Sequence, residues 1–203
     1  MSKEEIQNRK EETYRRILDA SWDIAIKEGL EALSVRKVAT ALHFAPNNLY
    51  NYFRDKSELI YQLKKDAYEW TLTAVFNEIP DCPTMQETIE TVAYRLMHTA
   101  LKEPARYIVM TSDLIMDSEE PLDRQINDYL ADMISRGIER GEFRTIDPQM
   151  TATNIRTAII SFVRWISAQK EFSQEQADNY LYNFLSIIFN GVKASSADTE
   201  APK

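Results

Sequence analysis

Helix-breaking residues are scarce in this chain, and their scarcity limits the folds that it can adopt. Four glycines and seven prolines occur among 203 residues, and the apolar residues between them recur at the three- and four-residue spacing of helices. No useful stretch alternates apolar and polar residues with the period of two that a half-buried strand requires. The sequence therefore predicts an all-α protein of about nine helices and no strands.

Local signals mark where several of these helices begin and end. Gly29 suits the position just past a helix end, and Ser34, Ser57 and Asp147 suit N-caps. Pro46 fits the first turn of a helix. The predicted helices cover residues 11–28, 35–42, 46–53, 58–79, 84–102, 105–117, 121–140, 148–170 and 174–192.

Several classes of protein are not expected. No apolar run approaches the roughly 18 residues of a membrane span, and the amino terminus lacks a signal peptide, which predicts a cytoplasmic protein with no membrane partner. Cys82 is the only cysteine, and with His43 and His98 it makes no zinc cluster. The sequence holds no Gly-rich phosphate loop, HExxH or nucleophile motif. We therefore expect no metal, no cofactor and no enzyme.

The charge is distributed unevenly. The formal net charge is −8, but residues 1–56 hold ten Lys/Arg against nine Asp/Glu. Phosphate binding depends on a local basic face rather than on the charge of the whole chain. We predict a nucleic-acid-binding domain over 1–56, a helical domain over 57–193 and a flexible tail over 194–203.

Two short predicted helices, 35–42 and 46–53, are joined by a three-residue break and flanked by longer helices. This order is typical of a helix-turn-helix unit, whose second helix enters the major groove of DNA. At helical spacing, Leu49 and Phe53 face inward in that second helix. The opposite side then carries three asparagines and, at its flanks, two tyrosines: Asn47, Asn48, Asn51, Tyr50 and Tyr52.

These side chains suit DNA. Asparagine can pair with the N6 and N7 atoms of adenine, and tyrosine hydroxyls can reach phosphate oxygens, which fixes the register without reading sequence. Each has a plainer alternative. Asn48 and Asn51 could be solvated surface amides, and Tyr50 could pack under the adjoining helix. Arg36 and Lys37 could be ordinary surface charges.

The segment SVRKVATALHFAPNNLYNYFRDKSELI, residues 34–60, resembles the DNA-binding region of the tetracycline-repressor (TetR) family of bacterial regulators. The resemblance covers residues 15–63. It implies backbone or edge-base contacts from Ser34 and Arg36, and a phosphate contact from Lys56. Lys56 could instead pair with a nearby carboxylate. The full set of predicted DNA-binding residues is Ser34, Arg36, Lys37, Pro46, Asn47, Asn48, Tyr50, Asn51, Tyr52 and Lys56.

The sequence departs from the family pattern at the turn. The family commonly has Gly where His43 stands, and often Ser where Ala45 stands. Histidine tolerates a positive φ better than most residues, and loss of the serine removes a cap worth about 1 kcal/mol. These departures leave the operator sequence open.

The resemblance also implies a small-molecule effector and a homodimer. Aromatic and sulphur side chains would suit an apolar or aromatic effector, although such residues at helical spacing are usually plain core. The predicted effector-binding residues are Trp70, Tyr94, Met97, His98, Tyr107, Met110, Leu114, Phe162 and Trp165.

The last two predicted helices are apolar around most of their circumference. Helices of this kind need cover on several sides, and a second subunit would supply it, although a wide internal core is the alternative. The predicted interface residues are Ile159, Phe162, Val163, Ile166, Leu181, Phe184, Leu185 and Ile188. The expected function is a ligand-responsive repressor that binds a palindromic DNA operator; a helical protein-interaction module and an unrecognised helical enzyme are the alternatives.

Overall fold

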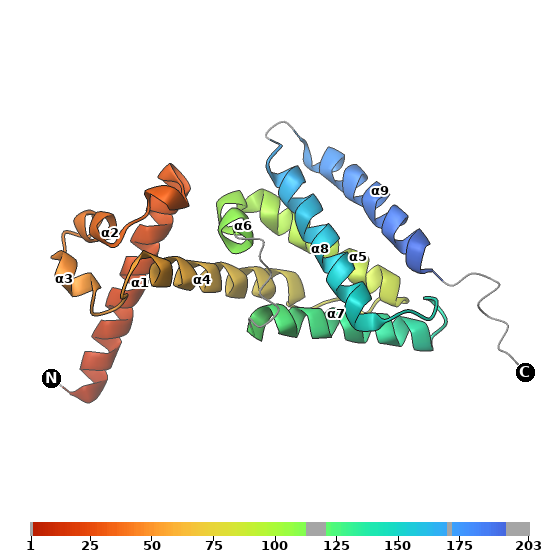
Figure 1. The fold of residues 1–203 in the computed structure, drawn as a ribbon, viewed down its shortest axis with the longest axis horizontal. Coiled ribbons are helices and arrows are strands. Elements are labelled where there is room, and N and C mark those ends of the chain that lie inside the picture. The colour runs from red at the N-terminus through yellow and green to blue at the C-terminus, as the bar shows by residue number, and fades with distance from the viewer. Residues whose placement is uncertain (1, 113–120, 170–171, 194–203) are drawn as a thin grey trace, which may run out of the picture. The chain divides into compact units, whose positions relative to one another are not determined.

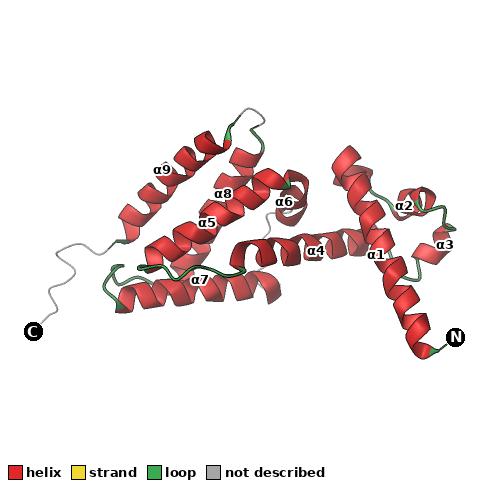
Figure 2. Cartoon of the chain, turned by 180° about the vertical axis from the view of Figure 1, so that it is seen from behind, coloured by secondary structure: helices red, strands yellow, loops and turns green. Residues whose placement is uncertain are grey.

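The computed structural model describes residues 2–112, 121–169 and 172–193, and this part of the chain is helical (Figure 2). It holds nine α-helices and one short 3₁₀ helix, η1, and an isolated antiparallel bridge joins Phe143 and Lys193. The all-α prediction is confirmed. The elements are α1 (Lys3–Glu28), η1 (Leu30–Ala32), α2 (Val35–Ala41), α3 (Pro46–Leu49), α4 (Lys56–Phe76), α5 (Met85–Lys102), α6 (Pro104–Thr111), α7 (Pro121–Glu139), α8 (Pro148–Ser167) and α9 (Gln174–Val192) (Figure 1).

The chain forms two compact units, Met1–Glu69 and Trp70–Lys203. The division lies inside α4, later than the predicted boundary at residue 56, because the first part of α4 completes the core of the first unit. The indole Nε1 of Trp22 on α1 donates to Asp66 Oδ2 on α4 at 2.8 Å. This part of α4 also contributes three fully buried side chains, Leu59, Leu63 and Ala67.

Helix α1 begins earlier than the predicted segment 11–28. Ser2 and Glu5 form a capping box, in which the Ser2 hydroxyl accepts from the Glu5 N–H and the Glu5 carboxylate accepts from the Ser2 N–H. This arrangement satisfies backbone donors at the helix start and stabilises it. Gly29 ends the helix with φ at 88°, a conformation that favours glycine.

Three other predicted boundaries were wrong. Helix α3 ends at Leu49 rather than at residue 53, and the Tyr52 and Phe53 N–H groups both donate to the Leu49 carbonyl in a turn. The cap of α4 is Asp55 rather than Ser57, since Asp55 Oδ1 accepts from the Glu58 N–H at 2.9 Å. Helix α4 ends at Phe76, short of residue 79.

The second unit has one core to which α5, α7, α8 and α9 all contribute. The Phe143 ring packs directly against the backbone of α7 at Gly137. A β-carbon at this position would collide with the ring, so glycine is what allows this contact. The Phe143 ring also stacks near Phe189 of α9, with centroids 6.2 Å apart. The loop after α7 and the end of the last helix are thereby held together.

Some predictions fall on residues that the structure does not describe. The predicted helix 105–117 is observed as α6, and its later residues, Leu114 among them, lie outside the described part, as does the tail 194–203. Helix α8 ends at Ser167, short of the predicted residue 170. Across the described ranges, none of the helices has the length and apolarity to cross a membrane.

Candidate nucleic-acid interface

The turn between α2 and α3 is built around His43. Its φ of 56° lies in the left-handed region, where histidine is tolerated better than most residues. The next N–H, of Phe44, donates to the Ala39 carbonyl at 2.8 Å and ties the turn back to α2. The Arg16 guanidinium of α1 lies over the Phe44 ring, 5.3 Å from its centroid. The turn is therefore fixed from both sides, and it sets the direction in which α3 leaves.

Helix α3 is anchored through its inner face. Leu49 and Phe53 are 0% and 1% exposed, as predicted, and the Phe53 ring stacks on Tyr14 of α1 at 5.4 Å. The Tyr14 hydroxyl donates to Gln62 Oε1 at 2.9 Å. Burial, aided by the nearby Asp66 carboxylate, raises the pKa of Tyr14 above its ordinary value. Pro46 starts the helix, and Ala45 makes no side-chain cap, as expected.

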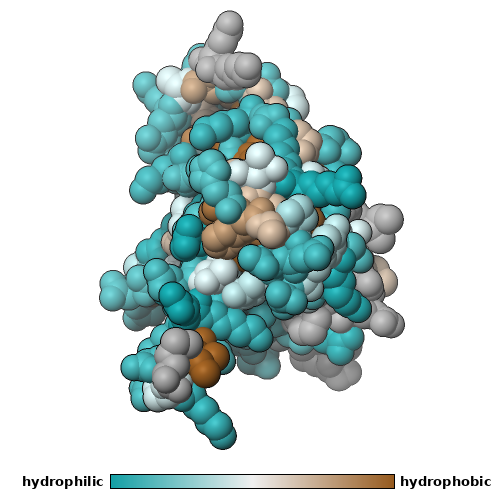
Figure 3. All heavy atoms as spheres, turned by 90° about the vertical axis from the view of Figure 1, so that its left-hand side faces the viewer, coloured by the Kyte–Doolittle hydropathy of each residue, from teal (hydrophilic) through white to brown (hydrophobic). Residues whose placement is uncertain are grey.

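The outer face of α3 and the turn after it is polar and open. Pro46 and the three asparagines, Asn47, Asn48 and Asn51, are exposed. Tyr50 is 49% exposed, so it does not pack under a neighbouring helix, and Tyr52 is half-buried. Figure 3 shows the side of the molecule that carries this unit: the surface is mostly hydrophilic around a smaller apolar patch. The structure thus brings these residues together on an accessible surface.

The side chains predicted to contact the DNA backbone differ in the hydrogen bonds and ion pairs that they already make within the protein. Arg36 on α2 is exposed, and neither a hydrogen bond nor an ion pair to its guanidinium is found within the described residues. Lys37 forms an ion pair with Glu28 at the end of α1. Lys56 Nζ donates to the Glu31 carbonyl at 2.9 Å rather than to a carboxylate. The Ser34 hydroxyl caps α2, accepting from the Lys37 N–H at 3.2 Å.

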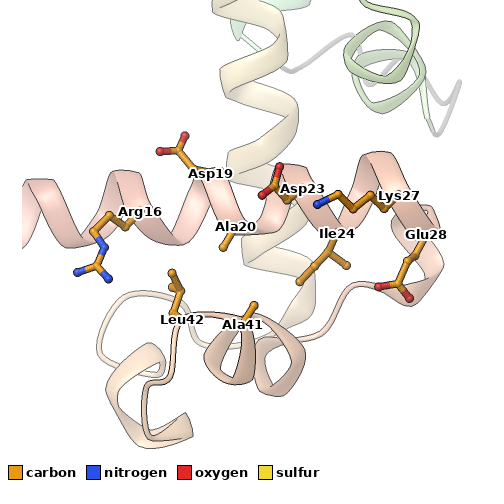
Figure 4. A pocket seen from close by; sticks show the side chains of 9 residues that line it. All are labelled: Arg16, Asp19, Ala20, Asp23, Ile24, Lys27, Glu28, Ala41 and Leu42. Carbon is orange, nitrogen blue, oxygen red and sulfur yellow. The ribbon is translucent and has the colours of Figure 1, made fainter.

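A groove that the sequence does not predict runs between α1 and the end of α2 (Figure 4). Its volume is about 510 Å³. Apolar side chains line part of the groove, and charged side chains of α1 line the rest. The lining residues are Arg16, Asp19, Ala20, Asp23, Ile24, Lys27, Glu28, Ala41 and Leu42.

In the second unit, the predicted effector-binding residues are spread over different environments. Met97 and Tyr107 are buried in the core, and the Tyr107 hydroxyl donates to the Ile160 carbonyl at 3.0 Å. Met110 and Phe162 are half-buried. Trp165 is 46% exposed. These residues therefore do not form one lining.

Two other predicted residues lie where α5 meets α9. His98 Nε2 lies 2.7 Å from Asp178 Oδ1, and the Tyr94 hydroxyl donates to the Asp178 carbonyl at 3.5 Å. Burial, followed by the effect of the Asp178 carboxylate, raises the pKa of Tyr94. Trp70 of α4 lies elsewhere, under the Arg106 guanidinium at 5.2 Å from the ring centroid.

A hollow of about 370 Å³ opens between α4 and α7. Leu72, Phe76, Gln125, Ile126 and Tyr129 line it, and none of them belongs to the predicted set. The Phe76 and Tyr129 rings meet edge to face at 5.2 Å. The only sequence signal was the helical spacing of Gln125, Ile126 and Tyr129, which place their side chains on one side of α7.

Most of the predicted dimer-interface residues are buried within their own chain. Five of the eight are buried in this way, so they offer no free surface to a partner: Ile159, Val163, Ile166, Leu181 and Leu185. Phe162, Phe184 and Ile188 are half-buried, and the first two stack at 4.1 Å. The apolar circumference of both helices is largely covered by the wide core that was the alternative.

A different face of α8 and α9 is exposed. Trp165 and Tyr180 meet edge to face at 5.8 Å, and Ile187, seven residues after Tyr180 on the same side of α9, is 71% exposed. Ser161, one turn before Trp165, is exposed as well. We call Ser161, Trp165, Tyr180 and Ile187 the α8–α9 face.

Comparison with known proteins agrees with this geometry. Residues 17–63 match the model of the bacterial regulatory proteins of the tetR family, and residues 83–192 match the tetracyclin repressor-like C-terminal domain. The HTH-type transcriptional repressor KstR2 of Mycolicibacterium smegmatis is 23% identical over 182 residues, which cover 85% of this chain and 87% of the relative.

Solved structures have the same fold. The fatty acid degradation regulator FadR from Bacillus halodurans superposes with a TM-score of 0.70 at 16% identity, covering 90% of this chain and 97% of that one. AibR in complex with isovaleryl coenzyme A and operator DNA gives a TM-score of 0.68 at 16% identity, with 87% and 97% covered. The family-model matches span both units, and the chain therefore belongs to the TetR family of DNA-binding transcriptional regulators.

Proposed function

We propose that this protein is a repressor that binds a palindromic operator as a homodimer and leaves it when a small, apolar or aromatic effector binds. One observation carries the proposal. Leu49 and Phe53 hold α3 from inside, and three asparagines stand exposed on the opposite side. Solvated amides at adjacent positions of an anchored helix can read base edges in a major groove.

The division of work on the DNA follows from chemistry. A bidentate asparagine–adenine pair discriminates against a wrong base by about 1–3 kcal/mol, so Asn47 and Asn48 would set sequence preference. Tyr50, Tyr52 and Arg36 would contact phosphates and fix the register. Because the phosphate contacts are electrostatic, affinity for any DNA would fall steeply with salt.

If two subunits paired through the α8–α9 face, the homodimer would carry two copies of α3, one for each half of the operator. The face combines the Trp165 and Tyr180 rings with Ile187, and exposed apolar clusters on soluble proteins usually mark association sites. A twofold axis through this face would make the contact self-complementary. Two recognition helices about 34–36 Å apart would then match two half-sites one DNA turn apart.

The effector would enter the second unit. The hollow between α4 and α7 has a volume of about 370 Å³, within the usual range for small-molecule sites. Of the two solved structures compared above, one is a fatty acid degradation regulator and the other is a complex with isovaleryl coenzyme A and operator DNA. Acyl thioesters are therefore the first class to test.

Helix α4 would couple effector to DNA. It contributes residues to both units; the hollow takes Leu72 and Phe76 from its later part, and Lys56 begins it. An effector lowers operator affinity only as far as it prefers the conformation that does not bind DNA. A bound dimer that covers a promoter blocks transcription without further contacts, which favours repression.

Selection of bound sequences from a random DNA library tests the proposal. We expect an inverted repeat to be enriched, and Asn47→Ala with Asn48→Ala to lose it while retaining the thermal midpoint. Isovaleryl coenzyme A and longer acyl thioesters, added to the complex, should raise the protein's thermal midpoint and release DNA. Enrichment of no sequence would contradict the DNA-binding role. A monomer that captures another protein would instead support the interaction module.

A further inference from the structure

The acid that ends α1 lies against a lysine of the proposed DNA surface. Glu28 is the last residue of α1, and its carboxylate pairs with the Lys37 ammonium on α2. The two side chains are 48% and 37% exposed, so water and a ligand phosphate can both reach them. In Figure 4 the Glu28 side chain extends from α1 on the side where α2 lies.

The partial charges at the helix ends do not stabilise Glu28 or Lys37. A helix carries a partial negative charge at its C-terminus and a partial positive charge at its N-terminus. Glu28 stands in the last turn of α1 and Lys37 in the first turn of α2, so each charge is at the end that disfavours it. The two residues are stabilised by each other rather than by their helices.

We propose that Glu28 competes with operator phosphate for Lys37 and so limits DNA affinity. This inference rests on the proposed DNA-binding function. While Glu28 holds Lys37, the pair is neutral and attracts no phosphate. To contact the DNA backbone, the ammonium must leave the carboxylate, and the carboxylate then lies close to the incoming phosphates.

Two neighbouring cations show what is particular about Lys37. Arg36, one residue earlier, has a guanidinium with no ion pair among the described residues, so its full charge faces outward. Lys56 donates to the neutral Glu31 carbonyl, which positions its charge without cancelling it. Of these three, Lys37 is the cation whose charge a carboxylate offsets.

The test uses the full chain and the operator found by selection. Glu28→Gln keeps the length of the side chain and removes its charge. We expect the dimer to bind DNA about fivefold more tightly, because an exposed pair is lost from each subunit. The slope of log affinity against log salt should steepen by about 0.9 per subunit, as one more phosphate is neutralised.

A double-mutant cycle assigns the effect to Lys37. Lys37→Gln should weaken binding more in the Glu28→Gln background than in the wild type. Arg36→Gln should weaken it equally in both backgrounds. Asp23→Asn is the charge-matched control, since Asp23 is another exposed acid of α1 on the rim of the groove, and it should change affinity less than Glu28→Gln does.

Three outcomes would overturn the inference while the wild type binds its operator: unchanged or weaker binding by Glu28→Gln, an equal gain from Asp23→Asn, or a Lys37→Gln effect that is the same in both backgrounds. Weaker binding would show that Glu28 positions Lys37 for phosphate. A wild type that binds no DNA would defeat the proposed function itself. Thermal midpoints of all variants exclude misfolding as the cause.

Discussion

In the first unit the candidate functional side chains are polar and open to solvent to different degrees, whereas in the second they are mostly apolar and partly or fully buried. An asparagine such as Asn48 on an open helix face has no part in a core, so its presence there indicates another task. Met97 and Tyr107 have the residue types that an effector pocket would use, yet they fill the core. Polar recognition can therefore be read from sequence more readily than an apolar site, which uses the same residues as packing.

The largest expected effect comes from removing the inner anchor of α3. Leu49→Ala should lower the free energy of unfolding of the first unit by about 3 kcal/mol, because it leaves a cavity beneath the helix. Denaturant unfolding followed through Trp22 fluorescence measures this loss, in a variant without Trp70 and Trp165. Operator binding should disappear along with it. A Leu49→Ala protein as stable as the parent would mean that α3 is not held from inside.

Charge placed on the α8–α9 face should separate the subunits without unfolding them. Ile187 is 71% exposed, so Ile187→Asp costs the monomer little, but it would bury a carboxylate in the proposed interface. We expect sedimentation to report a monomer, and operator affinity to fall about 100-fold as the paired contacts are lost.

The matched control for Ile187 is Tyr182. It is 70% exposed on the same helix, but it lies about 140° around the axis. Tyr182→Asp should therefore leave the dimer intact. Dissociation by both variants, or by neither, would place the interface elsewhere.

A single recognition amide should matter less than the dimer. Asn48→Ala should cost about 1–3 kcal/mol of operator binding and relax the sequence preference at one position of each half-site. Competition gel shifts with operators changed one base pair at a time measure both effects. The variant should unfold like the parent, in contrast to Leu49→Ala next to it. A uniform loss over all sequences would mean that Asn48 contacts phosphate rather than a base.

The smallest effect is an alkaline loss of stability that both units should share. Burial raises the pKa of Tyr14 in the first unit and of Tyr94 in the second above the ordinary value of 10.0. As the pH rises, the tyrosines of the unfolded chain therefore lose their protons before those of the folded chain. Their full contribution to the free energy of unfolding is present below pH 10 and is lost as the pH rises toward the folded pKa values. Tyr14→Phe and Tyr94→Phe should each flatten the decline of the unfolding midpoint in that range. If the decline is unchanged in either variant, the pKa of the tyrosine that was replaced is not raised by folding.

The helices were predictable where the signal is local. Gly29, Ser34 and Asp147 were each recognised as boundary residues because capping depends on one side chain and the backbone next to it. Ser57 was predicted as the cap of α4, but Asp55 is an equally good capping residue, and only the geometry of the turn shows that it is the cap. The early end of α3 was also missed: after Leu49 the chain forms a turn in which the Tyr52 and Phe53 N–H groups donate to the Leu49 carbonyl.

The parts of the site that escaped prediction depend on contacts between elements. The Glu28–Lys37 pair forms only when α1 and α2 pack together, and the hollow between α4 and α7 joins residues far apart in the sequence. The apolar pattern of α8 and α9 did not distinguish residues that pack inside the chain from residues left exposed. Ile166 and Leu181 have the pattern of interface residues and are core.

Hydroxyl-radical footprinting of the selected operator tests the central claim most directly, namely that the α8–α9 face pairs two chains so that two asparagine-bearing helices read DNA. We predict two equally protected segments whose centres are about 34–36 Å, or one helical turn, apart, both lost together in Ile187→Asp. A single protected segment, or two segments that persist in a proven monomer, would contradict it.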